Sequence, residues 1–228
     1  NNNAPDDFIG LDRFEARKKL LNELIKKDLL SKEENIKNKV PYGDRSNSII
    51  EPFLTEQWFV DAKKLAINAK KIVKKKKTNF FPSNWSKTYF QWMNNIEPWC
   101  ISRQLWWGHQ IPAWYGPDKK IFVASNETEA KKIAKKYYKK KVQIDQDPDV
   151  LDTWFSSGLW AFATLGWPNK TKYLKKFYPT TVLVTGFDII FFWVARMIMF
   201  GMEFMKKEPF KDIYVHALVR DEKGQKMS

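Results

Sequence analysis

The stretch TTVLVTGFDIIFFWVARMIMFGMEFMKKEPFKDIYVHALV, residues 180–219, decides the fold of this chain. Its β-branched run 180–184 predicts a strand, the apolar run 189–204 predicts a buried helix, and residues 213–219 predict a second strand. A strand, a long helix and a second strand within about forty residues are typical of a βαβ unit. The pattern therefore predicts an α/β fold with a parallel sheet and a right-handed crossover.

The apolar run 189–204 is interpreted as a core helix and not as a membrane span. It falls short of the roughly 20 apolar residues that a spanning helix needs. Arg196 lies in its middle and Glu203 near its end, and both charges are costly in lipid. No membrane partner is therefore predicted.

The chain has 228 residues, with 40 Lys and Arg against 26 Asp and Glu, which gives a net charge of +14. Such a field favours a polyanionic partner, and nucleic acid is the commonest one. The alternative is a solvated lysine surface that reflects codon bias, since only six of the basic residues are arginine. A single cysteine, Cys100, and two histidines exclude a disulfide framework, a cysteine-based zinc cluster and a histidine-rich metal site. This composition fits a reduced, cytoplasmic setting.

Three amphipathic helices are predicted upstream of the βαβ unit. The first lies within residues 10–30, with Asp12 as its N-cap, and the second covers residues 56–77. The third follows Ser86. Its inward-facing residues are expected to be Tyr89, Trp92, Met93 and Ile96.

The middle of the chain predicts smaller elements. Residues 111–115 and 121–124 predict a hairpin, and a lysine-rich helix follows over 127–140. Residues 116–147 are therefore interpreted as a surface excursion. Residues 153–165, rich in Trp and Phe, predict a further helix.

The corner Gly186-Phe187-Asp188-Ile189, between the first strand and the core helix, is the main candidate site. Ligands of open parallel sheets bind beyond the carboxyl ends of the strands. Asp188 could accept hydrogen bonds from backbone N–H groups or from ribose hydroxyls, and Ile189 shares a helical face with Trp193. A carboxylate beside an apolar wall suits a small apolar substrate with a polar handle. The alternative is a helix cap with two core residues behind it.

Three further segments allow both a functional and a structural interpretation. Trp154 in DTWFSSG is either a pocket wall or an ordinary buried aromatic residue. The turn KGQKMS, residues 223–228, either neutralises phosphates at the sheet edge or is a solvated turn. The cluster of aromatic, cationic and amide side chains within residues 99–109 either stacks on exposed bases or forms a core layer between two domains.

Four strings of the sequence resemble successive blocks of the valyl-tRNA synthetases, a family of class I aminoacyl-tRNA synthetases. They are WCISRQLWWGHQIPAWYG (99–116), DVLDTWFSSGLWAFATLGWP (149–168), TGFDIIFFWVARMIMFG (185–201) and VHALVRDEKGQKMS (215–228). Upstream, VPYGDRSNSIIEPFLTEQWFV (40–60) resembles the return from that family's editing insertion. The isoleucyl and leucyl sister families share the ISRQ and KMS elements. The motifs WWGHQIP and DTWFSS, however, resemble those of the valyl family.

The resemblance implies a division of the chain. Residues 56–228 would form the C-terminal half of a Rossmann-like nucleotide-binding domain, and residues 1–55 the C-terminal part of the editing insertion with its return linker. The family's HIGH motif has no match in this sequence. The 228-residue chain by itself is therefore predicted to be inactive.

The resemblance also implies roles for individual residues. Gly186 and Asp188 would bind the adenosine of ATP, together with His216, Ala217 and Leu218 at the end of the next strand. The walls around the amino-acid side chain would be Trp154, Ile189 and Trp193. The residues that clamp the ATP phosphates would be Lys226, Met227 and Ser228. The candidate tRNA contacts are Arg103, Gln104 and Trp107.

The implied reaction is ATP-dependent activation of valine to valyl-adenylate and its transfer to tRNA(Val), with editing of threonine in the full-length enzyme. ATP would bring Mg²⁺ with it. Some members of the family carry zinc-binding Cys pairs near positions equivalent to Tyr115 and Val40, but this chain has no Cys there, so no zinc is predicted. A cytoplasmic monomer is expected. The alternatives are an isoleucyl-type sister synthetase and a non-catalytic basic RNA-binding module.

Overall fold

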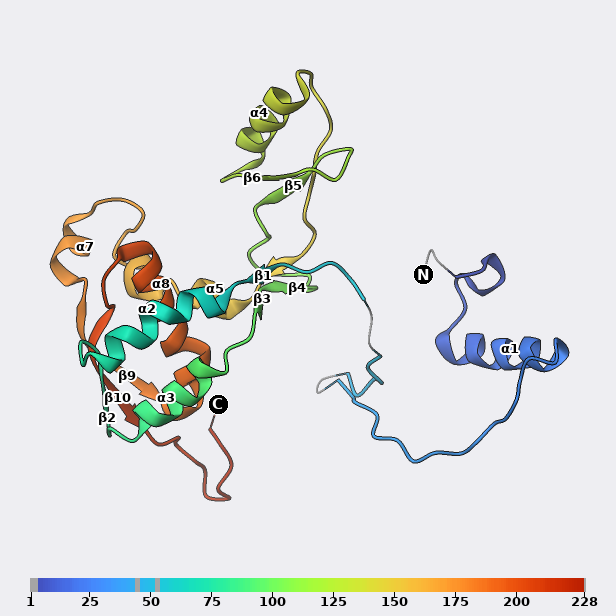
Figure 1. The fold of residues 1–228 in the computed structure, drawn as a ribbon, viewed down its shortest axis with the longest axis horizontal. Coiled ribbons are helices and arrows are strands. Elements are labelled where there is room, and N and C mark those ends of the chain that lie inside the picture. Colours follow the sequence, from blue (N-terminus) through green and yellow to red (C-terminus); the bar gives the residue numbers. More distant parts are fainter. Residues whose placement is uncertain (1–3, 44–45, 52–53, 228) are drawn as a thin grey trace. The chain divides into compact units, whose positions relative to one another are not determined.

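A computed structural model describes residues 4–43, 46–51 and 54–227 of the chain (Figure 1). The chain divides into two compact units, Asn1–Thr55 and Glu56–Ser228, which are described separately. The assignment of these units to an editing insertion and to half of a nucleotide-binding domain stays a prediction.

The first unit contains α1 (Arg13–Lys26), which follows the short 3₁₀-helix η1 (Asp6–Phe8). Asp12 caps α1, because its carboxylate accepts a hydrogen bond of 2.9 Å from Phe14 N. The predicted cap is thus confirmed. None of the α1 side chains is fully buried.

The second unit contains a sheet of three parallel strands in the order β2 (Asn79–Phe81), β10 (Phe210–His216) and β9 (Thr180–Gly186). β9 and β10 are adjacent and parallel, which confirms the predicted parallel βαβ arrangement. The predicted range of the second strand, 213–219, is wrong at both ends. The ladder begins earlier because Phe210 is fully buried opposite Thr180, and the chain leaves the sheet after His216.

The predicted core helix is a continuous helical stretch of three segments: η3 (Ile190–Ala195), α8 (Arg196–Phe200) and η4 (Gly201–Met205). The first and third segments are π-helical, and the 3₁₀ turn η2 (Phe187–Ile189) leads into them from β9. All five residues of α8 are buried, so the interpretation as a core helix is confirmed. Within the described residues, the search for a helix of membrane-spanning length and hydropathy found none.

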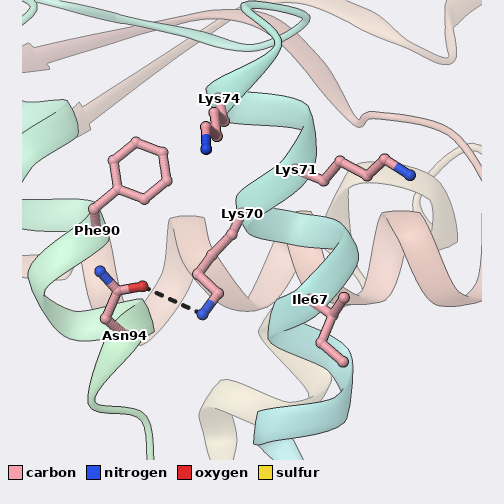
Figure 2. Close-up of a pocket in the computed structure, with 6 residues that line it drawn as sticks. All are labelled: Ile67, Lys70, Lys71, Lys74, Phe90 and Asn94. Carbon is pink, nitrogen blue, oxygen red and sulfur yellow. Dashed lines mark hydrogen bonds between the residues drawn. The ribbon is translucent and has the colours of Figure 1, made fainter.

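α2 (Ala62–Lys74) and α3 (Trp85–Asn94) lie side by side, and both contact the core helix (Figure 1). Figure 2 shows the hollow between them, of about 570 Å³. Six residues line it: Ile67, Lys70, Lys71, Lys74, Phe90 and Asn94. Lys70 Nζ donates a hydrogen bond of 3.2 Å to Asn94 Oδ1 across this hollow.

The predicted inward face of α3 is partly wrong. Tyr89 and Met93 are buried as expected, but 52% of Trp92 is exposed. The Trp92 ring stacks on Phe191 instead, with 4.9 Å between ring centroids. Because Tyr89 and Met93 already fill the core face, Trp92 lies at its edge and covers a second aromatic ring there.

The predicted single helix over residues 153–165 is two short helices, α5 (Thr153–Ser157) and α6 (Trp160–Ala163), followed by α7 (Lys172–Phe177). Gly158 marks the break. A Cβ at this position would lie 2.8 Å from the ring of Phe200, so only glycine permits this approach to α8.

The predicted hairpin is confirmed by β5 (Ala113–Tyr115) and β6 (Ile121–Val123), and β7 (Asp145–Gln146) pairs with the other edge of β5. The lysine-rich helix α4 (Glu127–Tyr138) contacts this small sheet. The sheet and α4, here called the hairpin unit, share a separate hydrophobic cluster of Trp114, Phe122, Ala124, Ala130, Ala134 and Ile144.

Two short antiparallel pairs complete the described fold. β1 (Phe59–Val60) pairs with β3 (Trp99–Cys100), and β4 (Ser102–Arg103) pairs with β8 (Val150–Leu151). The second pair brings the residues after β8, which begin α5, next to the strand that carries Arg103.

Candidate functional site

The carboxyl ends of β9 and β10 form the centre of the candidate site. Gly186 and His216, the last residues of the two strands, are direct partners in the parallel register. A Cβ at position 186 would lie 2.7 Å from Asp188 Oδ1 and 3.2 Å from Leu218 Cδ2. A side chain at this position would therefore displace the carboxylate of Asp188, which turns back over the end of the strand.

Asp188 and Lys226 form an ion pair at this corner. Lys226 Nζ donates to Asp188 Oδ2 at 2.5 Å, and the two side chains are 52% and 26% exposed, respectively. The hydrogen bond from Lys226 lowers the pKa of the Asp188 carboxyl below its usual value. Two groups from the predicted site are thus brought together across 38 positions of sequence.

The turn that delivers Lys226 is built from local hydrogen bonds. Asp221 Oδ1 accepts from the backbone N–H groups of Lys223 and Gln225, and Gly224 adopts a positive φ of 75°. Met227 N donates to Val219 O at 3.1 Å, which closes the turn. The side chain of Met227 is 60% exposed, and Ser228 lies outside the described residues.

His216, Ala217 and Leu218 follow the end of β10. His216 Nδ1 lies 2.7 Å from Ala217 O, and both residues are exposed, whereas Leu218 is half-buried against the Gly186 corner. These three residues and the Gly186–Asp188 turn therefore share one edge of the sheet, as the sequence predicts.

Two tryptophans join η3, which follows this corner in the chain, to α5. Trp193 of η3 donates its indole Nε1–H to Ser157 O, the last residue of α5, at 3.2 Å. Trp154 of α5 lies against Phe192 of η3, with 5.9 Å between ring centroids. Trp154, Ile189 and Trp193 are all half-buried, so each keeps an accessible apolar surface.

The candidate tRNA contacts form a separate group on and after β4. Arg103 donates to Cys100 O and Ser102 O, at 3.0 and 2.8 Å, and Gln104 donates to Asp149 Oδ2 at 2.6 Å. Trp107 is 90% exposed. Trp99 is buried within the chain, whereas Trp107 and its neighbour Trp106 are exposed in it, so for these two both the base-stacking interpretation and a core layer between two domains stay predictions.

Sequence reasoning missed a buried carboxylate, Asp152. It is 5% exposed, accepts hydrogen bonds from Trp99, Arg196 and the Trp154 backbone, and forms an ion pair with Arg103. The acidic residue immediately before a predicted helix was a usable signal, because such a position favours an N-cap. Its arginine partners, Arg103 and the buried Arg196, come from distant segments and carried no such signal.

Asp147 is a second buried carboxylate that joins distant segments. Its Oδ2 accepts from Trp58 Nε1 at 2.8 Å and from the Tyr115 hydroxyl at 2.6 Å. Burial, with the hydrogen bond to Asp147, raises the pKa of Tyr115 to about 12. Asp147 thus ties the start of the second unit to the hairpin unit.

Among the residues that the structure describes, no group of three or more His, Cys, Asp or Glu side chains could hold a metal ion. The carboxylates described above are engaged by Trp, Arg, Lys and Tyr donors instead. The corner and the two tryptophans offer a carboxylate acceptor, a lysine cation and apolar surface.

The parallel sheet, with a carboxylate and a lysine brought together beyond the ends of adjoining strands, matches a known class of protein, which the comparison with family models identifies. The family model described as "tRNA synthetases class I (I, L, M and V)" matches residues 13–228, and the chain belongs to this family. The chain is 81% identical over its full length to the valine–tRNA ligase of Pelagibacter ubique (strain HTCC1062), of which it covers 26%. It is 58% identical, again over its full length, to the valine–tRNA ligase of Caulobacter vibrioides, of which it covers 25%.

The chain thus spans about a quarter of the length of these relatives. A solved structure of Mycobacterium tuberculosis methionyl-tRNA synthetase in complex with methionyl-adenylate is similar to it, with a TM-score of 0.52 and 15% identity. The similar region covers 83% of this chain and 31% of that structure. At this level of identity the likeness concerns the fold.

Proposed function

We propose that the protein to which this chain belongs is a valine–tRNA ligase, which activates valine with ATP and transfers it to tRNA(Val). The observation that carries this proposal is the juxtaposition of Gly186, Asp188 and Lys226 at adjoining strand ends. The high identity to relatives named valine–tRNA ligase supports it over the isoleucyl alternative.

Each residue of the corner has a distinct task in this proposal. Asp188 accepts hydrogen bonds from the ribose hydroxyls of ATP, and Gly186 leaves room for the nucleoside to approach. His216, Ala217 and Leu218 lie beside the adenine. Lys226, with Met227 and Ser228, faces the phosphates, where its cation stabilises the charge that develops during displacement of pyrophosphate. Mg²⁺ would arrive with ATP, and no structural zinc is proposed.

The apolar wall accounts for the choice of amino acid. Trp154, Ile189 and Trp193 offer hydrocarbon and aromatic surface to the valine side chain. A pocket of this kind discriminates weakly against an isosteric side chain that carries a hydroxyl, so threonine also enters. Hydrolytic editing by another part of the full-length protein would correct this error.

The remaining assignments follow from the same proposal. Residues 1–55 would be the end of the editing insertion, and residues 56–228 the C-terminal half of a Rossmann-like domain, with 116–147 as a surface excursion. Among the tRNA candidates, Arg103 and Gln104 already hold acceptors within the chain, so Trp107 is favoured as a base-stacking contact. The full-length protein is proposed to be a cytoplasmic monomer.

Amino-acid-dependent exchange of pyrophosphate into ATP by the full-length protein tests the proposal. Valine should support exchange, and tRNA(Val) should then be charged. Exchange that depends on isoleucine would favour the sister synthetase. RNA binding without amino-acid-dependent exchange would favour the non-catalytic module.

A pair of variants locates the activity. Asp188→Ala should abolish most of the valine-dependent exchange, because the ribose loses its acceptor. Asp145→Asn is the matched control, since Asp145 is an exposed aspartate on β7 of the hairpin unit. Equal exchange activity of the two variants would contradict the proposed role of the corner.

A further inference from the structure

The carboxylate of Asp152 contacts four groups in the second unit, three as hydrogen-bond donors and one, Arg103, as an ion-pair partner. Its Oδ2 accepts from Trp99 Nε1 at 2.9 Å and lies 3.0 Å from Arg103 Nη2 and 3.4 Å from Arg196 Nη1. Its Oδ1 accepts from the backbone N–H of Trp154 at 3.1 Å. These groups come from β3, β4, α8 and α5, so one side chain joins four elements.

The charges around Asp152 hold it in place. The Arg196 guanidinium is 7% exposed and lies over the Trp99 ring, with 3.6 Å between Cζ and the ring centroid. Arg103 approaches from the more exposed side. A buried carboxylate with two guanidinium partners and an indole donor has its hydrogen-bonding capacity filled, and such a group keeps one geometry.

The same carboxylate fixes one end of α5. Asp152 is the N-cap of this five-residue helix, and the first N–H it holds belongs to Trp154. At the other end, Ser157 O accepts from the indole of Trp193. Both aromatic walls of the proposed amino-acid pocket are therefore attached to α5, which Asp152 anchors to the core.

We infer that Asp152 is a positioning residue for the amino-acid pocket. It fixes the position of Trp154 directly and the position of Trp193 through α5. Asp152 therefore determines how large a substrate side chain fits into the pocket. This inference rests on the proposed function. Small displacements of groups that contact a substrate reduce its productive binding strongly.

Asp152→Asn in the full-length protein tests the inference by pyrophosphate exchange. Asparagine retains one acceptor oxygen but loses the charge and the second acceptor. The KM for valine should rise about tenfold or more, whereas the KM for ATP should change less than about threefold, because Gly186 and Asp188 lie on other elements. The preference for valine over the smaller 2-aminobutyrate should fall several-fold, since a loosened wall no longer rewards the extra methyl group.

Trp99→Phe is a second, milder variant that keeps the buried charges balanced. It removes the indole donor to Asp152 and replaces the ring under Arg196 with a smaller one. It should raise the KM for valine less than Asp152→Asn does, again without a matching change for ATP. It decides the question if Asp152→Asn does not fold. Asp145→Asn is the control for a general effect of removing an aspartate.

The possible outcomes separate the two proposals. Wild-type protein without valine-dependent exchange overturns both. Active wild type with folded variants whose KM for valine is unchanged overturns the positioning role alone. Equal increases in KM for valine and ATP also overturn it, because they indicate a structural role only.

Discussion

Asp152 and Asp188 are two carboxylates that each bind a cationic side chain, in opposite surroundings. The side chain of Asp152 is 6% exposed and is shared by Arg103, Arg196 and Trp99. The side chain of Asp188 is 26% exposed and holds only Lys226 among the side chains of the described residues. The partners of Asp152 are held by the packing around them. Asp188, by contrast, can release Lys226 and accept a ligand without disruption of the core.

The choice of cation follows from these surroundings. Burial lowers the pKa of Arg196 to about 10, while Asp152 opposes that shift, so the guanidinium remains charged at neutral pH. A buried lysine would lose its charge more readily. At the exposed corner a lysine is sufficient, and in the proposed function its flexible stem would let the ammonium leave Asp188 for a nucleotide.

The largest expected difference between the two carboxylates is in stability. Asp152→Ala should lower the free energy of unfolding by about 3–5 kcal/mol, because it leaves the Arg196 cation buried without a counter-ion. Asp188→Ala should change it by less than about 1 kcal/mol, since the pair is partly solvated. Chemical denaturation of the full-length protein measures both, and similar losses for the two variants would remove the proposed contrast.

A smaller effect is expected on nucleotide binding. Asp188→Asn should raise the KM for ATP by about ten- to a hundredfold, which corresponds to the roughly 1.5–3 kcal/mol of a hydrogen bond to a charged group. The KM for valine should move much less. Pyrophosphate exchange at varied ATP and valine concentrations separates the two values, and a selective change for valine would contradict the assignment of Asp188.

A still smaller effect is expected on the pKa of the Asp188 carboxyl. Lys226→Met should raise the pKa of Asp188 towards the ordinary value of 3.8, because the hydrogen bond that lowers it is lost. In the unsubstituted protein the pair therefore stabilises the fold at pH values above 3.8 and ceases to do so as the pH falls through the lowered pKa. Carboxyl-detected NMR of the two proteins checks this, and an unchanged pKa would show that Lys226 is not the cause.

The smallest effect is that of salt. Raising the ionic strength from 0.1 to about 1 M should weaken the exposed Asp188–Lys226 pair by a fraction of a kcal/mol and leave the buried Asp152 network unaffected. A double-mutant cycle on each pair at both salt concentrations measures the difference. Equal salt sensitivity would mean that the Asp152 network is hydrated.

The sequence pattern predicted the elements whose structure depends on residues close together in the chain. The βαβ unit, the Asp12 cap and the hairpin all follow from periodicity or turn chemistry, and the Gly186–Asp188 corner follows from its place at a strand end. β2 escaped prediction because three residues after a lysine run are too few for an alternating pattern. The Asp152 network escaped because its side-chain partners are separated from it by 44 to 53 positions and meet only in the folded protein.

The tryptophans show a second limit of prediction from sequence, because composition does not separate buried from exposed side chains. Trp99 and Trp107 occur in one aromatic-rich string, yet the first is 8% and the second 90% exposed. Composition assigns both to a core equally well. The packing of the Trp99 ring against Phe155, Phe200 and the Arg196 guanidinium distinguishes them, and these partners are distant in sequence.

The π-helical winding of η3 has a consequence for the chain's tolerance of length changes. A π turn bonds residue i to residue i+5, so it holds one residue more than the corresponding α turn. η3 thus absorbs what amounts to a one-residue insertion directly before Arg196. Successive residues lie about 100° apart around an α-helix and closer together in angle around a π-helix, which has more residues per turn. Deleting Val194 or Ala195 would therefore change the angle between Trp193 and Arg196, so that the indole bond to Ser157 and the guanidinium contact with Asp152 would no longer form together.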